Sequence, residues 1–276
     1  MPLSVTTWNI NSVRLRADQV IRHIEACNPD IVCLQETKCP DEQFPSSVFR
    51  QRGYGHIAVN GQKGYHGVAI LSRIPFVRTD VKAFCGQNDC RHISVRLPSQ
   101  CADLEIHNFY VPAGGDVPDP ELNPKFRHKL DFLGEMLAWT DADQPARRNS
   151  ILVGDLNVAP YVTDVWNHKA LLNVVSHTPI ETEALENIRA TAGFVDAVRK
   201  LAPEPEKIFT WWSYRSKDHT VNDRGRRLDH IWLSPGVAAG LEDFVISRDA
   251  RSWERPSDHV PVTVRLNLEA VQQAAA

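Results

Sequence analysis

The sequence of 276 residues has no long apolar run. No stretch approaches the roughly 20 apolar residues that a helix needs to cross a membrane, so we expect no membrane span and no membrane partner. The first residues, Met-Pro-Leu-Ser-Val, also lack the basic and apolar regions of a secretory signal peptide. These absences predict a cytoplasmic protein.

Paired cysteines are also missing. The six cysteines include no Cys-x-x-Cys pair, which argues against a structural zinc site. Disulfide bonds are not expected in a cytoplasmic protein. Cys33 lies inside an apolar run and is interpreted as a small core residue.

An excess of basic charge is absent, because 31 Lys and Arg residues face 34 Asp and Glu residues, for a net charge of -3. Nucleic-acid-binding proteins often carry a basic excess, and the composition gives no such signal. A local basic face, or acidic residues gathered at a metal site, can still lie within a near-neutral total. The hydrophobic fraction of 42% supports a sizeable core.

The stretch from Ser150 to Pro160 is the centre of the functional prediction. Its apolar run Ile-Leu-Val predicts a strand buried on both faces, and Gly154 permits a bend or a close backbone approach. In an extended chain Asp155 and Asn157 project to the same side. Oxygen ligands of this kind suit a hard cation such as Mg²⁺, although an Asx-type turn after a strand uses the same residue types.

Strand and helix patterns alternate along the chain. Short apolar or alternating segments predict strands at 3–10, 30–34, 68–71, 92–97, 104–111, 228–233 and 260–266. Helical periods mark 14–27 and 126–140. We predict one domain over residues 1–267 with an α+β fold, in which helices flank two packed mixed β-sheets, and a tail over 268–276 that is frayed or weakly helical.

Polar residues fall at the ends of these strands, where apolar residues would be expected. They are Asn9, Glu36, Tyr110, Asp155, Asn157, Asp229, Asp258 and His259. A buried carboxylate or amide is costly unless it is paired or binds a metal. A single case indicates a turn, but six or more at the ends of different strands predict one convergent site.

Several of these residues have a structural alternative. Glu36 equally suits the start of a helix, and Asp229 has either a histidine or one of the nearby arginines as a natural partner. Tyr110 and the pair Trp211-Trp212 are common core residue types. His66, His107 and His230 are interpreted as structural.

Eight motifs in order give the sequence a family resemblance. They are Trp8-Asn-Ile-Asn11, Leu34-Gln-Glu-Thr-Lys38, Gly61-Gln-Lys-Gly64 with Gly67-Val-Ala69, Tyr110-x-Pro112, Gly154-Asp-Leu-Asn157, Trp211-Trp-Ser-Tyr-Arg215, Arg227-Leu-Asp229 and Ser257-Asp-His259. Together they resemble the exonuclease III family of AP endonucleases, within the wider endonuclease/exonuclease/phosphatase fold. The resemblance runs from about Val5 to Leu266 and implies a two-sheet sandwich with the site at one end of the sheets.

The resemblance also implies roles for single residues. The metal would be Mg²⁺, with Mn²⁺ as an alternative, and its ligands would be Asn9, Glu36, Asp155, Asn157 and Asp258. The catalytic set would be Tyr110, Asp155, Asn157, Asp229 and His259, with Asp229 holding His259 against the scissile phosphate. Substrate contacts would come from Arg91, Trp211, Trp212, Arg224 and Leu228. No site is transferred from 162–169, where the sequence departs from the family pattern.

The function implied is a Mg²⁺-dependent DNA repair phosphodiesterase that cleaves 5′ to abasic sites, with 3′–5′ exonuclease and 3′-end-trimming activity. Its partner would be double-stranded DNA with abasic sites or 3′ ends, bound by a monomer in the cytoplasm or at the nucleoid. One alternative is a phosphoesterase of the same fold acting on RNA or a small phosphorylated substrate. Another is a non-catalytic nucleic-acid-binding module.

Overall fold

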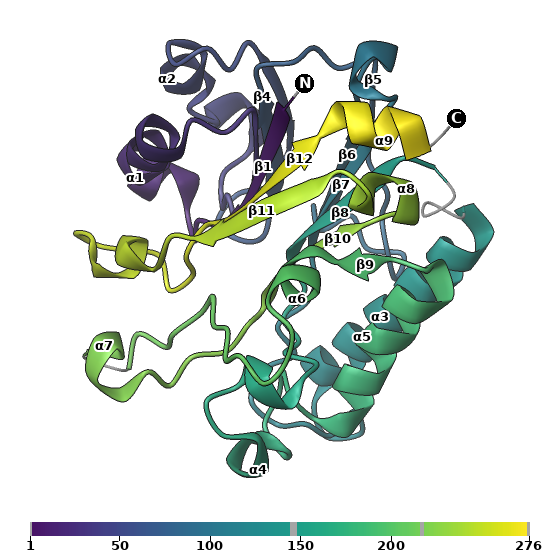
Figure 1. The fold of residues 1–276 in the computed structure, drawn as a ribbon. Helices are drawn as coiled ribbons and strands as arrows, with labels where there is room; N and C mark the ends of the chain where they lie inside the picture. The colour runs from purple at the N-terminus through teal and green to yellow at the C-terminus, as the bar shows by residue number, and fades with distance from the viewer. Residues whose placement is uncertain (1, 144–147, 216–217, 275–276) are drawn as a thin grey trace.

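The computed structural model describes residues 2–143, 148–215 and 218–274. Two six-stranded sheets pack against each other in this part of the chain, and helices lie outside them (Figure 1). The predicted α+β sandwich of two mixed sheets is therefore confirmed. Among the described helices, none is both long and apolar enough to span a membrane.

The first sheet contains the first and the last strand of the described chain. Its strands, in spatial order, are β11 (Leu241–Ile246), β12 (Val262–Asn267), β1 (Pro2–Asn9), β2 (Ile31–Gln35), β4 (Val68–Ser72) and β3 (His56–Asn60). Strands β1 and β2 run parallel, and the other neighbours are antiparallel. The N-terminal and C-terminal strands thus lie side by side.

The second sheet has the order β5 (Arg78–Asp80), β6 (His92–Arg96), β7 (Glu105–Tyr110), β8 (Ser150–Asp155), β10 (Asp229–Leu233) and β9 (Val195–Asp196). Strand β8 is buried at every position, as its apolar run predicts. Gly154 has a φ of +147°, and a Cβ there would lie 1.9 Å from the carbonyl oxygen of Phe109. Only glycine permits this close approach of β7 to β8.

Helices surround the two sheets, and the longer ones cover their outer faces. The longer ones are α1 (Val13–Cys27), α3 (Pro124–Asp143) and α5 (Pro179–Ala192). The shorter ones are α2 (Ser46–Arg50), α4 (His168–Leu171), α6 (Ala197–Leu201), α7 (His219–Asn222), α8 (Pro235–Ala238) and α9 (Leu268–Ala274). Short 3₁₀ turns occupy Asp41–Gln43, Ser99–Cys101, Val162–Asp164 and Arg248–Ser252.

The apolar core has three main layers. One lies between the sheets and includes Val5, Ile93 and Val153. A second lies between the first sheet and the helices α1 and α2, and a third lies between the second sheet and the helix pair α3 and α5. Because each sheet is covered on both faces, its strand ends are the places where polar side chains can reach solvent.

The tail over 268–276 is helical in the part that is described, which is one of its two predicted alternatives. Residues Leu268–Ala274 form α9, whose Leu268 and Val271 are buried in the layer between the sheets. These two apolar residues share one face of the helix and anchor it. Residues 275–276 lie outside the described part of the chain.

A buried ion cluster joins the loop after β8 to β9 and β10. Arg227 is fully buried, and its guanidinium bonds both oxygens of Asp164 and one oxygen of Asp196, at 2.7–2.9 Å. Arg199 also bonds Asp164. Arg227, one of the nearby arginines that were an alternative partner for Asp229, is therefore already paired with these carboxylates.

We expect Arg227→Met to lower the free energy of unfolding by about 3–5 kcal/mol, because two buried carboxylates would lose their main counter-charge. Urea unfolding monitored by tryptophan fluorescence measures the change. Arg265→Met is the matched control, since Arg265 pairs with Asp243 at the surface and such pairs contribute about 1 kcal/mol or less. Equal losses in the two variants would contradict this interpretation.

Candidate active site

Strand pairing in the second sheet places three of the predicted side chains next to one another. Asp155 ends β8 and is the register partner of Tyr110 at the end of β7 and of Asp229 at the start of β10. The three residues therefore line the same edge of the sheet. The predicted meeting of strand-end residues is confirmed here by the register itself.

The first sheet supplies the remaining residues. Asn9 ends β1 beside Gln35 of β2, and Glu36 follows directly. Asp258 and His259 precede β12, and the backbone carbonyl of His259 accepts a hydrogen bond from the Trp8 indole at 3.0 Å. Residues that are distant in sequence thus meet where the ends of the two sheets adjoin.

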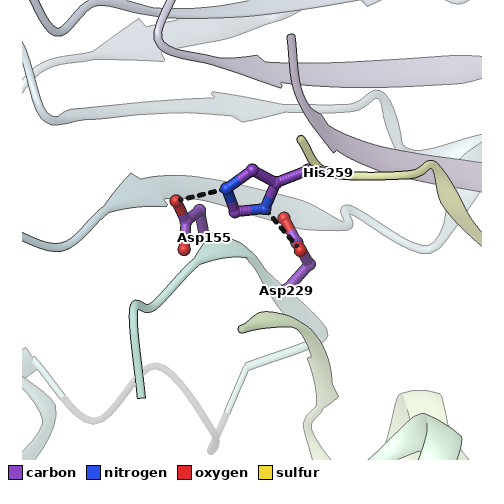
Figure 2. A group of neighbouring side chains, drawn as sticks. All are labelled: Asp155, Asp229 and His259. Atoms are coloured by element: carbon purple, nitrogen blue, oxygen red, sulfur yellow. Dashed lines mark hydrogen bonds and ion pairs between the residues drawn. The ribbon is translucent and has the colours of Figure 1, made fainter. Parts of the chain in front are cut away.

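His259 lies between two carboxylates (Figure 2). Its Nδ1 is 2.8 Å from Asp229 Oδ2, and its Nε2 is 3.6 Å from Asp155 Oδ2. Burial alone would lower the pKa of His259, but the charges of Asp229 and Asp155 outweigh it and raise the pKa to about 10. The imidazolium form is therefore stable at neutral pH, and the predicted pairing of His259 with Asp229 is confirmed.

Asp155 is almost completely buried. Burial raises the pKa of its carboxyl to about 7, against the opposing effect of the His259 charge. Two amides hold one of its oxygens: Asn9 Nδ2 donates to Oδ2 at 2.8 Å, and Asn157 Nδ2 donates to the same atom at 3.1 Å. A carboxyl with a pKa near neutrality can accept a proton during a reaction.

Glu36 faces this group from the first sheet. Its Oε1 accepts hydrogen bonds from Asn9 Nδ2 at 2.9 Å and from the Tyr110 hydroxyl at 2.8 Å, and its Oε2 pairs with Lys38 at 2.8 Å. Burial would raise the pKa of Glu36, but Lys38 and these hydrogen bonds lower it below its usual value. The helix-start alternative is excluded, because Glu36 has a φ of +50° and no helix begins there.

Asn9 does not lie as a metal ligand would. Its Nδ2 joins Glu36 to Asp155, and its Oδ1 accepts the backbone N–H of Asn11 at 3.0 Å. The amide oxygen is therefore turned away from the carboxylates, because they attract the donor end. The structure assigns Asn9 a bridging position in place of the predicted ligand position.

Asn157 depends on a buried ion pair that the sequence reasoning missed. The backbone carbonyl of Asn157 accepts a hydrogen bond from Lys129 Nζ of α3 at 2.7 Å. Lys129 pairs with Glu181 of α5, and both side chains are fully buried. The helical period at 126–140 predicted this helix, but a lysine in an amphipathic helix gives no sign that it is buried.

Asp258 and Trp211 meet at the other side of the site. The Trp211 indole donates to Asp258 Oδ2 at 2.9 Å, and Asn11 donates to Oδ1 at 3.0 Å. Burial would raise the pKa of Asp258, but the charge of His259 and these donors lower it. Asp258 is thus held as a carboxylate.

A cavity of about 1080 Å³ opens beside these residues. Glu36, Asp155, Asn157, Asp258 and His259 line one part of it, and the remaining part is lined by residues including Trp166, Trp211, Arg224, Arg226 and Leu228. Five predicted site residues thus share one cavity with three of the predicted substrate contacts, Trp211, Arg224 and Leu228.

Two predicted substrate contacts are not in the cavity wall. Trp212 is fully buried in the core beside Phe209, because consecutive residues of an extended segment face opposite sides. Arg91 lies against the ring of Tyr110 and donates to its backbone carbonyl at 3.2 Å. Its other guanidinium nitrogens contact Asp89 and His66. Arg91 therefore packs against Tyr110 and lies outside the cavity lining.

The donor set fits a hard divalent cation. Side chains beside the cavity that present oxygen include Glu36, Asp258 and Asn157, whose Oδ1 has no bond within the described residues. One buried oxygen of Asp229, Oδ1, also lacks a partner there. The group of Asp155, Asp229 and His259 is close enough to hold an ion, but both nitrogens of a protonated His259 carry hydrogen and cannot act as ligands.

Comparison with known proteins agrees with this geometry. The endonuclease/exonuclease/phosphatase family matches residues 6–259. Exodeoxyribonuclease III of Haemophilus influenzae is 32% identical over 264 residues, which cover 93% of this chain and 97% of that protein.

Two solved structures share nearly the whole fold. An AP endonuclease from Archaeoglobus fulgidus has a TM-score of 0.88 and 31% identity, and the match covers 96% of this chain and 99% of that one. A Neisseria 3′ phosphatase bound to a product DNA hairpin has a TM-score of 0.87 and 30% identity, with the same two coverages of 96% and 99%. The chain therefore belongs to the endonuclease/exonuclease/phosphatase family, within its exonuclease III group of phosphodiester-hydrolysing nucleases.

Proposed function

We propose that this protein is a Mg²⁺-dependent DNA repair nuclease that hydrolyses the phosphodiester 5′ to an abasic site and trims blocked 3′ ends. The observation that carries the proposal is the position of His259, held between Asp229 and Asp155 at the wall of a cavity that also contains Glu36 and Asp258. A cationic donor, a buried carboxyl and a set of oxygen ligands are the groups that hydrolysis of an anionic ester requires.

Glu36 and Asp258 would hold the cation, while Asn157 offers its amide oxygen to the attacking water. When bound, Mg²⁺ supplies a Lewis acid that neutralises charge on a phosphate oxygen, and Mn²⁺ has the same preference for oxygen ligands. Tyr110 fixes the direction of the Glu36 carboxylate through its hydroxyl. In this scheme Tyr110 orients Glu36, and its predicted contact with the phosphate would form only when substrate is bound.

Three side chains of the protein supply the remaining steps of the proposed reaction. Asp155 accepts the proton of the attacking water, and Asn157 orients that water with the amide oxygen that its own contacts leave free. His259, kept protonated by Asp229, donates a hydrogen bond to a phosphate oxygen. The proton transfer to Asp155 is general base catalysis, which accelerates reactions by about 10²–10⁴-fold. The hydrogen bond from His259 is electrostatic stabilisation, for which a single donor contributes about 10²–10³-fold.

The cavity accounts for the substrate. An abasic nucleotide is already unpaired, so moving it out of the duplex costs less than moving an intact one. Trp211 and Leu228 offer an apolar wall for a sugar without its base. The resemblance to a DNA-bound Neisseria 3′ phosphatase supports blocked 3′ ends as a second substrate, and we propose that the protein acts on double-stranded DNA as a monomer in the cytoplasm.

A labelled duplex with one internal tetrahydrofuran residue tests the proposal. We expect a single cut 5′ to this residue in Mg²⁺, and none in EDTA, because the carboxylate cluster needs a cation to bind the phosphate. Tetrahydrofuran cannot undergo β-elimination, so a lyase cannot give the same product. Absence of cleavage in Mg²⁺, by protein shown to be folded by thermal melting, would contradict the proposal and favour a small phosphorylated substrate.

A further inference from the structure

Arg226 faces the same cavity as the catalytic group. Trp211 pairs in antiparallel register with His259 on one side and with Arg226 on the other. Paired residues of antiparallel segments place their side chains on one face, so His259, Trp211 and Arg226 point the same way. Adjacent partners are separated by about 4.5–5.5 Å, which puts Arg226 about 10 Å from His259 across the Trp211 ring.

The guanidinium of Arg226 is held in place but is not neutralised. Its Nη1 donates to the carbonyl of Val175 at 2.9 Å and to the hydroxyl of Ser176 at 2.7 Å. Its charged carbon lies 5.3 Å from the centre of the Trp211 ring. Within the described residues it forms no ion pair, and its Nε and Nη2 donate to no protein group.

The charged groups around Arg226 do not neutralise the positive charge of its guanidinium. Glu181 favours the charged guanidinium through space, but its own carboxylate is taken by Lys129, Ser176 and Thr178. Burial lowers the pKa of Arg226, although an arginine stays charged at neutral pH. A largely buried cation is costly unless a counter-charge compensates it. Arg226 lines the cavity, so an anion bound there could supply this counter-charge.

We propose that Arg226 determines specificity by binding an anionic group, a carboxylate or a phosphate, on the substituent that is esterified to the scissile phosphorus. This inference rests on the proposed function and names its preferred substrate class. With the phosphorus near His259, an anion one or two ester linkages away reaches the free Nε and Nη2 donors. A planar guanidinium binds such groups through two parallel hydrogen bonds.

Two DNA duplexes whose 3′-end substituents are similar in size, one charged and one neutral, distinguish an effect of charge from an effect of shape. One duplex carries a recessed 3′-phosphoglycolate end, whose substituent is –CH₂–COO⁻, and the other carries a 3′-phospho-(2-hydroxyethyl) end, whose substituent is neutral. For Arg226→Met, we expect kcat/KM to fall about 10- to 100-fold on the glycolate and less than about 3-fold on the hydroxyethyl ester, because a hydrogen bond to a charged group is lost. Arg226→Lys, which keeps the charge, should recover part of the difference.

An internal tetrahydrofuran duplex shows whether the anion is instead the phosphate of the next nucleotide. A loss on this duplex similar to that on the glycolate means that Arg226 binds either anion, and a loss confined to the glycolate assigns it to the terminal carboxylate; both support an anion site. Arg78→Gln, a surface change far from the cavity on β5, controls for net charge.

Equal losses on the glycolate and hydroxyethyl ends would overturn the inference, since Arg226 would then act only through packing. A separate result bears on the proposed function: if wild-type protein cleaves none of the three duplexes, that function fails whatever Arg226 does. Thermal melting of each variant, and the neutral substrate as an internal standard, distinguish loss of binding from loss of folding.

Discussion

Replacing His259 with asparagine is expected to lower turnover of an abasic-site duplex by about 10²–10³-fold, because the cationic donor to the phosphate is removed. The asparagine amide nitrogen can take the place of Nδ1 and still donate to Asp229, so the variant should fold. Single-turnover cleavage in Mg²⁺ measures the chemical step. His56→Asn, at an exposed position on β3, is the matched control and should retain activity.

A substitution at Asp229 tests the protonation of His259 without removing the imidazole. Burial favours neutral His259, and the Asp229 carboxylate is the first of the charges that raise its pKa to about 10. In Asp229→Asn the imidazolium should lose its proton at lower pH, so the alkaline limb of the pH–rate profile should shift downward. A cleavage rate of His259→Asn within about 3-fold of wild type would contradict the role of His259 as a cationic donor to the phosphate.

Asp155→Asn is expected to reduce turnover by about 10²–10⁴-fold, because the amide has the shape of the carboxylate but cannot accept the proton of water. The stability of the variant should rise relative to wild type at alkaline pH, where the wild-type carboxyl is ionised. The folded-state pKa of Asp155 is raised from 3.8 to about 7, so the folded protein binds this proton more tightly than the unfolded chain. Stability from this group is present below pH 4 and is lost as the pH rises through 7.

Thermal melting at pH 5 and pH 8 therefore separates function from structure. The asparagine variant should lose less stability than wild type between these values, while its turnover is low at both. Asp141→Asn, at the exposed end of α3, is the control for the substitution itself and should change neither quantity. A variant that is both inactive and less stable than wild type at pH 8 would assign Asp155 a structural role.

The sequence predicted the site because burial of a carboxylate is costly. Asp155, Asp229 and Glu36 stand beside apolar runs, and the ends of strands are the places where such groups can be used. The structure brings them together as that reasoning requires. The choice between Arg and His as the partner of Asp229 was open until the fold placed Asp164 and Asp196 on Arg227.

Other features depend on contacts that no local pattern contains. Trp211 and Trp212 are both aromatic, so alternation shows that they face opposite sides but not which one faces the cavity. Lys129 reads as a solvent-facing helical residue, since its partner Glu181 is 52 positions away. The amide of Asn9 turns its nitrogen to two carboxylates from different sheets, and only the packed sheets determine that direction.

The place of β12 beside β1 has a consequence for synthesis on the ribosome. The strand that begins at Val262 must insert next to the first strand of the chain, and His259 and Asp258 arrive with it. A nascent chain that ends before this point lacks the cationic donor and one metal-side carboxylate. The nuclease should therefore stay inert until β12 has been made and has docked beside β1.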